Sequence, residues 1–179
     1  MRLLLLLLTS SLFLAAACTK ADDDTPTTPL DELPPATQVG ANTFGCLIDG
    51  VPFVNQGGGN FLPDISGSYI NSTPEIFTCI AFEIDAATGL LNSSVSFRVH
   101  QLEIGKVEPR LNKPTYRIYT PSAELEYFID STRFYEYRIT HHDPSQNIVS
   151  GIFENFSFCP TNGDTVHIKD GRFDVVYFE

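Results

Sequence analysis

Residues 94–102 read SVSFRVHQL, a stretch in which apolar and polar residues alternate from Val95 onward. Val95, Phe97 and Val99 share one side, and the residues between them are polar or charged. Side chains of a β-strand point alternately to its two faces, whereas an amphipathic helix repeats its apolar residues at intervals of three and four. The stretch is therefore predicted to be a half-buried strand of an antiparallel sheet, with Val95, Phe97 and Val99 facing the core.

Working outward, residues 76–84, IFTCIAFEI, place Ile76, Ile80 and Ile84 on one face and Cys79 on the other. No convincing helical period follows residue 40. The other predicted strands are 44–48, 51–54, 116–119, 123–129, 133–140, 148–158, 165–169 and 172–178.

Turn residues separate these strands. Asp49-Gly50, Asn162-Gly163 and Asp170-Gly171 suit tight hairpins, and a further hairpin is expected around Asp130-Ser131. The spacing predicts an all-β domain over residues 41–179, either a single antiparallel β-sandwich or a meandering, lipocalin-like barrel of about 8–10 short strands. The last three strands are expected to be adjacent. The final strand is apolar on both sides, which predicts a central position or an edge covered by a partner.

The chain begins MRLLLLLLTSSLFLAAAC, with Arg2 before an apolar run and three alanines before Cys18. This order is typical of a signal peptide, and the run is shorter than the ~20 residues of a membrane span. Leu-Ala-Ala-Ala-Cys resembles the lipobox of bacterial lipoproteins, with the preferred leucine displaced by one residue. The resemblance implies removal of residues 1–17 and acylation, with palmitate or a similar chain, at Cys18. An ordinary secretory signal and an uncleaved N-terminal anchor are the alternatives.

Residues 18–40 are predicted to be a disordered linker, because four prolines and five acidic residues among residues 19–40 leave little apolar surface to bury. Four residues just after Cys18 resemble the export signal of Bacteroidota lipoproteins: Lys20, Asp22, Asp23 and Asp24. The resemblance implies an outer-membrane lipoprotein at the cell surface, or otherwise on the periplasmic face. A solvated acidic linker is the alternative.

Two segments of the β domain resemble a group of Bacteroidota lipoproteins of unknown function. They are NTFGCLIDG at residues 42–50 and DGRFD at residues 170–174. The resemblance implies a membrane-anchored all-β domain and no particular activity. Asn155 departs from the aromatic alternation usual in that group. Arg172 and Asp174 have the same parity along the strand, so a surface pair between them is expected.

The formal net charge of −11 argues against nucleic acid as a partner and against electrostatic binding to anionic lipid. No GxSxG, HExxH, Walker or GxGxxG motif occurs in the sequence. Neither a cofactor nor a bound metal is predicted, and an enzyme is less favoured than a protein without catalytic residues.

Besides Cys18, the chain contains Cys46, Cys79 and Cys159. An exported protein can hold one disulfide among these three cysteines, and all three pairings are open. A buried free thiol is the alternative at each position.

Two titratable clusters raise a catalytic or metal hypothesis. Residues 141–143 read His-His-Asp. Adjacent side chains of a strand point apart, so two histidines on a strand rarely bind one metal, and although they could do so in a turn, zinc needs three or four ligands. A solvated turn is therefore favoured over a zinc site. Glu124 and Glu126 lie about 7 Å apart on one strand face, a separation that suits paired catalytic carboxylates. A cross-strand ion pair with Arg133 or Arg138 is the favoured account of these two residues.

One segment is so rich in aromatic residues that some are expected to be exposed or to line a cavity: Tyr127, Phe128, Phe134, Tyr135 and Tyr137. Four of these are predicted as a possible ligand patch: Tyr127, Phe134, Tyr135 and Tyr137. Exposed aromatic rings suit contacts with sugars or proteins. The sequence thus favours a non-catalytic binding or adaptor domain with a protein or glycan partner. A hydrolase acting on carbohydrate or lipid, and a structural subunit of a surface assembly, are the alternatives. Residues 130–132 and 164–166 also match a short O-glycan pattern.

Overall fold

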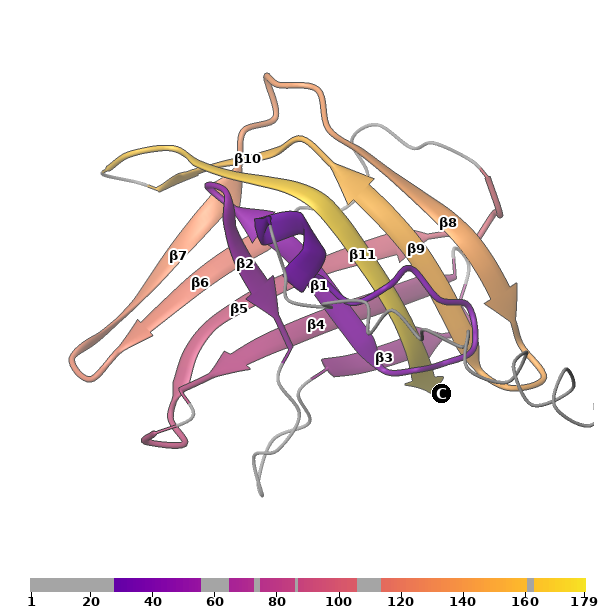
Figure 1. Ribbon diagram of the computed structural model, residues 1–179. Coiled ribbons are helices and arrows are strands. Elements are labelled where there is room, and N and C mark those ends of the chain that lie inside the picture. The colour runs from indigo at the N-terminus through magenta and orange to yellow at the C-terminus, as the bar shows by residue number, and fades with distance from the viewer. Residues whose placement is uncertain (1–27, 56–64, 73–74, 86, 106–113, 161–162) are drawn as a thin grey trace, which may run out of the picture.

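The computed structural model describes residues 28–55, 65–72, 75–85, 87–105, 114–160 and 163–179, and it is all-β (Figure 1). The strands of this described part are β1 (Thr43–Ile48), β2 (Val51–Val54), β3 (Ile65–Ile70), β4 (Ile76–Ile84), β5 (Leu91–His100), β6 (Thr115–Thr120), β7 (Ala123–Ile129), β8 (Glu136–Asp143), β9 (Ile148–Glu154), β10 (Phe156–Pro160) and β11 (Val166–Phe178). A 3-10 turn, η1 (Pro29–Glu32), precedes them. Within these ranges no helix has the length and hydropathy needed to cross a lipid bilayer.

The strands form one hydrogen-bonded network arranged in two layers (Figure 1). One layer has the order β8–β9–β11–β1–β2, and the other has the order β10–β7–β6–β5–β4–β3. β11 joins the two layers, because its first residues pair with β10 and its last residues pair with β3. Every pair is antiparallel except β3–β11. The all-β sandwich or barrel-like fold is therefore confirmed, and the final strand is central.

β11 is a single strand of 13 residues. In its first part the even-numbered residues point into the core, and in its second part the odd-numbered residues do. Asp170 has φ +53°, and the register with β1 slips there by one residue. The extra residue is a β-bulge, which lets Ile168 before it and Phe173 after it both point into the core. The predicted hairpin at Asp170-Gly171 is therefore wrong, because the positive φ bends a continuous strand instead of reversing it.

The parity of the core-facing residues inverts a second time between β9 and β10. Asn155 has φ +60° between the two strands, and Phe153 and Phe156 on either side of it are both buried. The predicted single strand 148–158 is thus two strands, with β8 paired to β9 and β7 paired to β10. These pairings also show that the hairpin predicted around Asp130-Ser131 is wrong, because β7 and β8 do not pair with each other.

The core lies between the two faces and consists largely of phenylalanine and tyrosine rings. The ring of Phe97 on β5 lies 5.6 Å from that of Phe153 on β9 and 5.1 Å from that of Phe173 on β11. Val95 and Val99 are buried beside Phe97, as the alternation predicts. Full burial of a side chain of this kind stabilises the fold by roughly 1.5–3 kcal/mol.

Residues 28–40 pack on the β domain, so the prediction of a disordered linker is wrong for this part of the segment. Leu33 is only 6% exposed. The carboxylate of Asp174 accepts a hydrogen bond from the Thr37 hydroxyl at 2.6 Å and three more from the backbone N–H groups of residues 39–41 at 3.0–3.1 Å. Burial of Leu33 and these charge-assisted bonds offset the entropy of ordering the segment. The ordered domain therefore begins by Thr28.

Candidate functional site

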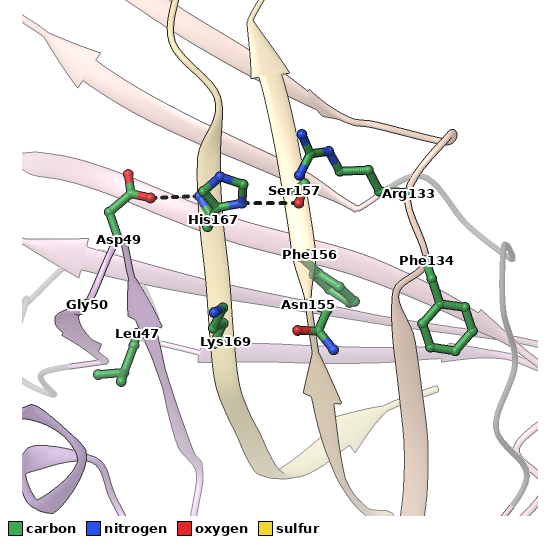
Figure 2. Close-up of a pocket in the computed structure, with 10 residues that line it drawn as sticks. All are labelled: Leu47, Asp49, Gly50, Arg133, Phe134, Asn155, Phe156, Ser157, His167 and Lys169. Carbon is green, nitrogen blue, oxygen red and sulfur yellow. Dashed lines mark hydrogen bonds between the residues drawn. The ribbon is translucent and has the colours of Figure 1, made fainter.

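A hollow of about 790 Å³ opens on the side of β1, β10 and β11 that faces away from the core (Figure 2). We call it the Phe134 groove. Its lining residues are Leu47, Asp49, Gly50, Arg133, Phe134, Asn155, Phe156, Ser157, His167 and Lys169. The β1–β2 turn forms one wall, the segment between β7 and β8 forms the other, and β10 and β11 run between them (Figure 2).

The first wall is a tight turn anchored to β11. Asp49 and Gly50 have φ of +49° and +83°, as the sequence predicts for this hairpin. The backbone N–H of Asp49 donates to the carbonyl of His167 at 2.8 Å, and the backbone N–H of His167 donates to Oδ1 of Asp49 at 2.9 Å. This pair of bonds holds the turn at a fixed position beside the groove.

Ser157 and His167 face each other on β10 and β11, with Ser157 Oγ 3.1 Å from His167 Nδ1. A serine–histidine pair suggests nucleophilic catalysis, in which a carboxylate orients the imidazole ring. The Asp49 carboxylate instead accepts its bond from the backbone of His167, and Ser157 is buried (Figure 2). Ser157 and His167 are directly opposite each other on neighbouring strands, where side chains commonly contact each other, so a structural role accounts for their hydrogen bond better than catalysis does.

The second wall presents an exposed aromatic ring. Phe134 is 63% exposed, and Arg133 beside it is ion-paired with Asp130, with Nε and Oδ2 3.3 Å apart. The hydroxyl and backbone N–H of Thr132 donate to Asp130 Oδ1 at 2.6 and 3.0 Å. These two hydrogen bonds lower the pKa of Asp130, which favours its charged form. The wall is therefore a turn fixed by these hydrogen bonds and this ion pair, and it carries Arg133 and the exposed ring of Phe134.

Exposed polar side chains lie between the two walls. Lys169 on β11 and Asn155, the left-handed residue between β9 and β10, are both exposed and both line the groove. The amide offers donors and an acceptor, and the ammonium offers donors only. An exposed ring with such neighbours has the composition of a ligand-binding surface.

The predicted aromatic patch is wrong as a set of four. Phe134 is exposed, but Tyr135 and Tyr137 are 5% and 4% exposed and belong to the core. The ring of Tyr135 meets Phe156 edge-on at 5.3 Å between centroids. Tyr127 is half-buried and packs against the core. Of these four residues only Phe134 is exposed.

Glu124 and Glu126 both contact Arg117 on the neighbouring strand β6, at 3.2 and 2.6 Å. The predicted cross-strand ion pair is therefore present, but its cation is Arg117 and not Arg133 or Arg138. Exposed pairs of this kind stabilise a fold by only about 0–1 kcal/mol. Pairing explains why the two carboxylates share a strand face, and no catalytic role is needed to account for them.

The segment His141-His142-Asp143 ends β8 and does not form the predicted turn. The ring of His142 lies 6.1 Å from that of Tyr177, and burial lowers the pKa of His142. Asp143 accepts hydrogen bonds from the hydroxyl and backbone N–H of Ser145 at 2.6 and 2.8 Å, which lower its pKa to about 2. No group of three His, Cys, Asp or Glu side chains that could hold a metal occurs in the described part of the chain.

The three cysteines of the domain are free thiols in the structure. Cys46 on β1 and Cys79 on β4 are buried, and Cys159 on β10 is half-buried. Burial raises the pKa of both Cys46 and Cys79, which keeps them protonated. They pack as small apolar side chains, the alternative that the sequence left open beside a disulfide.

Five residues with predicted roles in anchoring and export lie outside the described ranges: Cys18, Lys20, Asp22, Asp23 and Asp24. Comparison with known proteins brings no further assignment, since no family model, curated protein or solved structure matches the chain.

Several groove residues were not predicted as site residues. Asp49 has a predicted turn role, and His167 and Lys169 stand at strand positions that look like ordinary surface. Asn155 carries the one usable signal, because it interrupts an otherwise aromatic alternation. Only the fold brings these residues together with Phe134.

Proposed function

We propose that this protein is a non-catalytic binding domain held at a membrane surface, and that the Phe134 groove binds a glycan. The observation that carries the proposal is that the 63% exposed ring of Phe134 lines the same hollow as the exposed side chains of Asn155 and Lys169. An aromatic ring gains free energy when the C–H face of a sugar displaces water from it. The amide and ammonium groups then have sugar hydroxyls within reach as hydrogen-bond partners.

The dimensions and charge of the groove support this class of ligand. Its volume of about 790 Å³ lies within the range of small-molecule sites, roughly 300–1,000 Å³. Asp49 is the one carboxylate among its ten lining residues, and the cations are Lys169 and Arg133, of which Arg133 pairs with Asp130. This balance suits a neutral or acidic oligosaccharide. A glycosidase would use two carboxylates across the ligand, so the lining favours binding over hydrolysis.

The membrane location is proposed from the N-terminal sequence. The lipobox-like string before Cys18 and the acidic run after Lys20 support a lipid-anchored protein of the outer membrane that faces the cell surface. Two or more acyl chains hold a protein stably on a bilayer. Because residues 28–40 pack on the domain, the proposed tether is confined to residues 18–27, which span at most about 35 Å when fully extended. The domain then works close to the membrane that carries it.

Phe134→Ala is expected to weaken glycan binding by about tenfold or more, because it removes the apolar platform of the groove. A glycan array with the wild-type protein identifies the ligand, and calorimetric titration with that ligand measures the change. Phe128→Ala is the matched control, since Phe128 on β7 is 46% exposed and does not line the groove.

An equal loss in both variants, or unchanged affinity in Phe134→Ala, would contradict the groove as the binding site. A wild-type protein that binds no glycan but captures a protein partner through Phe134 would overturn the ligand class.

A further inference from the structure

A second hollow, of about 880 Å³, opens beside the start of β6. The register between β5 and β6 ends at Ser96 opposite Thr115, and β5 continues beyond this point to His100. The hollow lies at this step in the sheet. We call it the Arg98 window.

The lining of the window combines apolar and polar side chains. Phe97 and Tyr135, both core residues, line it together with Ile80 and Ile129. Four hydroxyl side chains stand around them: Thr78, Ser96, Thr115 and Ser131. The hydroxyls of Ser96 and Thr115 lie 2.6 Å apart and form a hydrogen-bonded pair across the two strands.

Two arginines flank this hydroxyl pair. Arg98 is two residues along β5 from Ser96, and Arg117 is two residues along β6 from Thr115. Because the strands are antiparallel, the arginines lie on opposite sides of the pair, each about 7 Å from it along its own strand. Both side chains line the window.

The two arginines differ in whether a carboxylate pairs with the guanidinium group. Arg117 is ion-paired with Glu126 and Glu124, which hold its guanidinium in place and neutralise it. Arg98 is exposed and forms no ion pair with any described residue. The ten lining residues include no carboxylate, in a chain with 22 acidic and 11 basic residues. Because Glu124 and Glu126 offset the charge of Arg117, Arg98 is the arginine of the window whose charge is open to an anion. Salt screens charges beyond about 8 Å, so the distant negative charge of the chain weakens this attraction little.

We propose that the Arg98 window binds a small organic anion that carries a carboxylate on a ring with an apolar face, such as a sugar acid. The carboxylate pairs with the guanidinium of Arg98, whose planar fork matches it in a bidentate geometry. The hydroxyls of Thr78 and Ser96 bond to the polar edge of the ligand, and its body covers Phe97 and Tyr135. This site is separate from the Phe134 groove, and its occupancy does not depend on the function proposed there.

The test is a calorimetric titration of the full-length protein in detergent with glucuronate, glucose and inorganic phosphate, at low and high salt. Glucuronate is expected to bind saturably and more weakly at high salt, phosphate to bind less tightly, and glucose not to bind. Arg98→Gln is expected to lower the affinity for glucuronate by about tenfold or more. Arg138→Gln is the matched control, because Arg138 is an exposed arginine on β8 outside both hollows, and its affinity is expected to equal that of the wild type.

Equal affinity for glucose and glucuronate, or no saturable binding of glucuronate, would overturn the proposal. Binding of phosphate without glucuronate would overturn the carboxylate class. Unchanged affinity in Arg98→Gln, or an equal loss in Arg138→Gln, would overturn the site. A melting temperature of Arg98→Gln close to that of the wild type establishes that a loss of binding is not a loss of fold.

Discussion

At the scale of single residues, Asp174 has the most consequential environment in the described structure. It is 1% exposed, although the sequence predicts a surface pair with Arg172. Its carboxylate accepts hydrogen bonds from the hydroxyls of Thr37 and Ser150 and from the backbone of residues 39–41. Burial raises the pKa of Asp174, but these donors together outweigh burial and hold the pKa below its ordinary value. The predicted surface pair is wrong because N-terminal donors, distant in sequence, enclose the carboxylate.

Asp174→Asn is expected to destabilise the protein by about 2–4 kcal/mol at pH 7, since an amide cannot accept all of these bonds and places its own donors against them. A native pKa below the unfolded value of about 3.9 means that the ionised carboxylate stabilises the fold above about pH 4. This contribution is lost as the pH falls through the native pKa. The difference between wild type and variant is therefore expected to shrink in acid, as measured by urea unfolding at pH 7 and near pH 2.

Asp164→Asn is the control for this prediction, because Asp164 is exposed and its substitution is expected to change stability by less than about 0.5 kcal/mol. A stability difference between wild type and Asp174→Asn that stays constant across this pH range would contradict the assignment of the acid sensitivity to Asp174.

At the scale of elements, two left-handed residues decide how the C-terminal third of the chain is divided. Asp170 bends β11 without interrupting it, and Asn155 separates β9 from β10. Side-chain parity inverts at each point, so that residues of opposite parity all reach the core. An Asp-Gly pair permits positive φ in a hairpin and in a bulge alike. The bulge forms here because β1 and β9 pair with β11 on both sides and hold it extended.

Gly171→Ala is expected to destabilise the fold by about 1–3 kcal/mol, by forcing a methyl group into a packed core. An added Cβ would clash with the ring of Phe153, which also packs against Phe44 and Phe97. Urea unfolding of Gly171→Ala, Phe153→Leu and the double variant measures the coupling. The double variant is expected to be less destabilised than the sum of the single changes, because leucine vacates the space the methyl needs. Simple additivity would contradict direct contact between these positions.

At the scale of the whole molecule, β11 connects every layer. It pairs with β1 and β9 along its length and with β10 and β3 at its two ends, so the final strand of the chain closes the fold. The N-terminal segment then packs on the same strand through Asp174. In the proposed arrangement the anchored N-terminus thus leads directly into the centre of the domain, and the lipid on Cys18 sets where the domain works.

If Cys18 is acylated as proposed, Cys18→Ala is expected to abolish incorporation of labelled palmitate and to move the protein from the membrane fraction to the soluble fraction, because the variant lacks the thiol that would carry the anchor. Cys159→Ala is the control, since Cys159 is a half-buried thiol of the domain and its loss leaves the anchor intact. Equal labelling of Cys18→Ala and the wild type would contradict lipidation at Cys18 and the tether proposed from it.

The sequence by itself determined the all-β class, the core-facing side of β5 and the tight turn at Asp49-Gly50, because these depend on local alternation and on residues that tolerate positive φ. From apolar residues on both faces it predicted that the final strand is central or is an edge covered by a partner, and the first of these is what the structure shows. Only the tertiary structure decided that Asp170-Gly171 is a bulge, that Tyr135 and Tyr137 are buried while Phe134 is exposed, and that residues 28–40 are ordered. These outcomes depend on which distant strand pairs with which, and on donors brought to Asp174 from the other end of the chain. Both hollows have the same origin, since each is lined by segments that meet only when the sheet has formed.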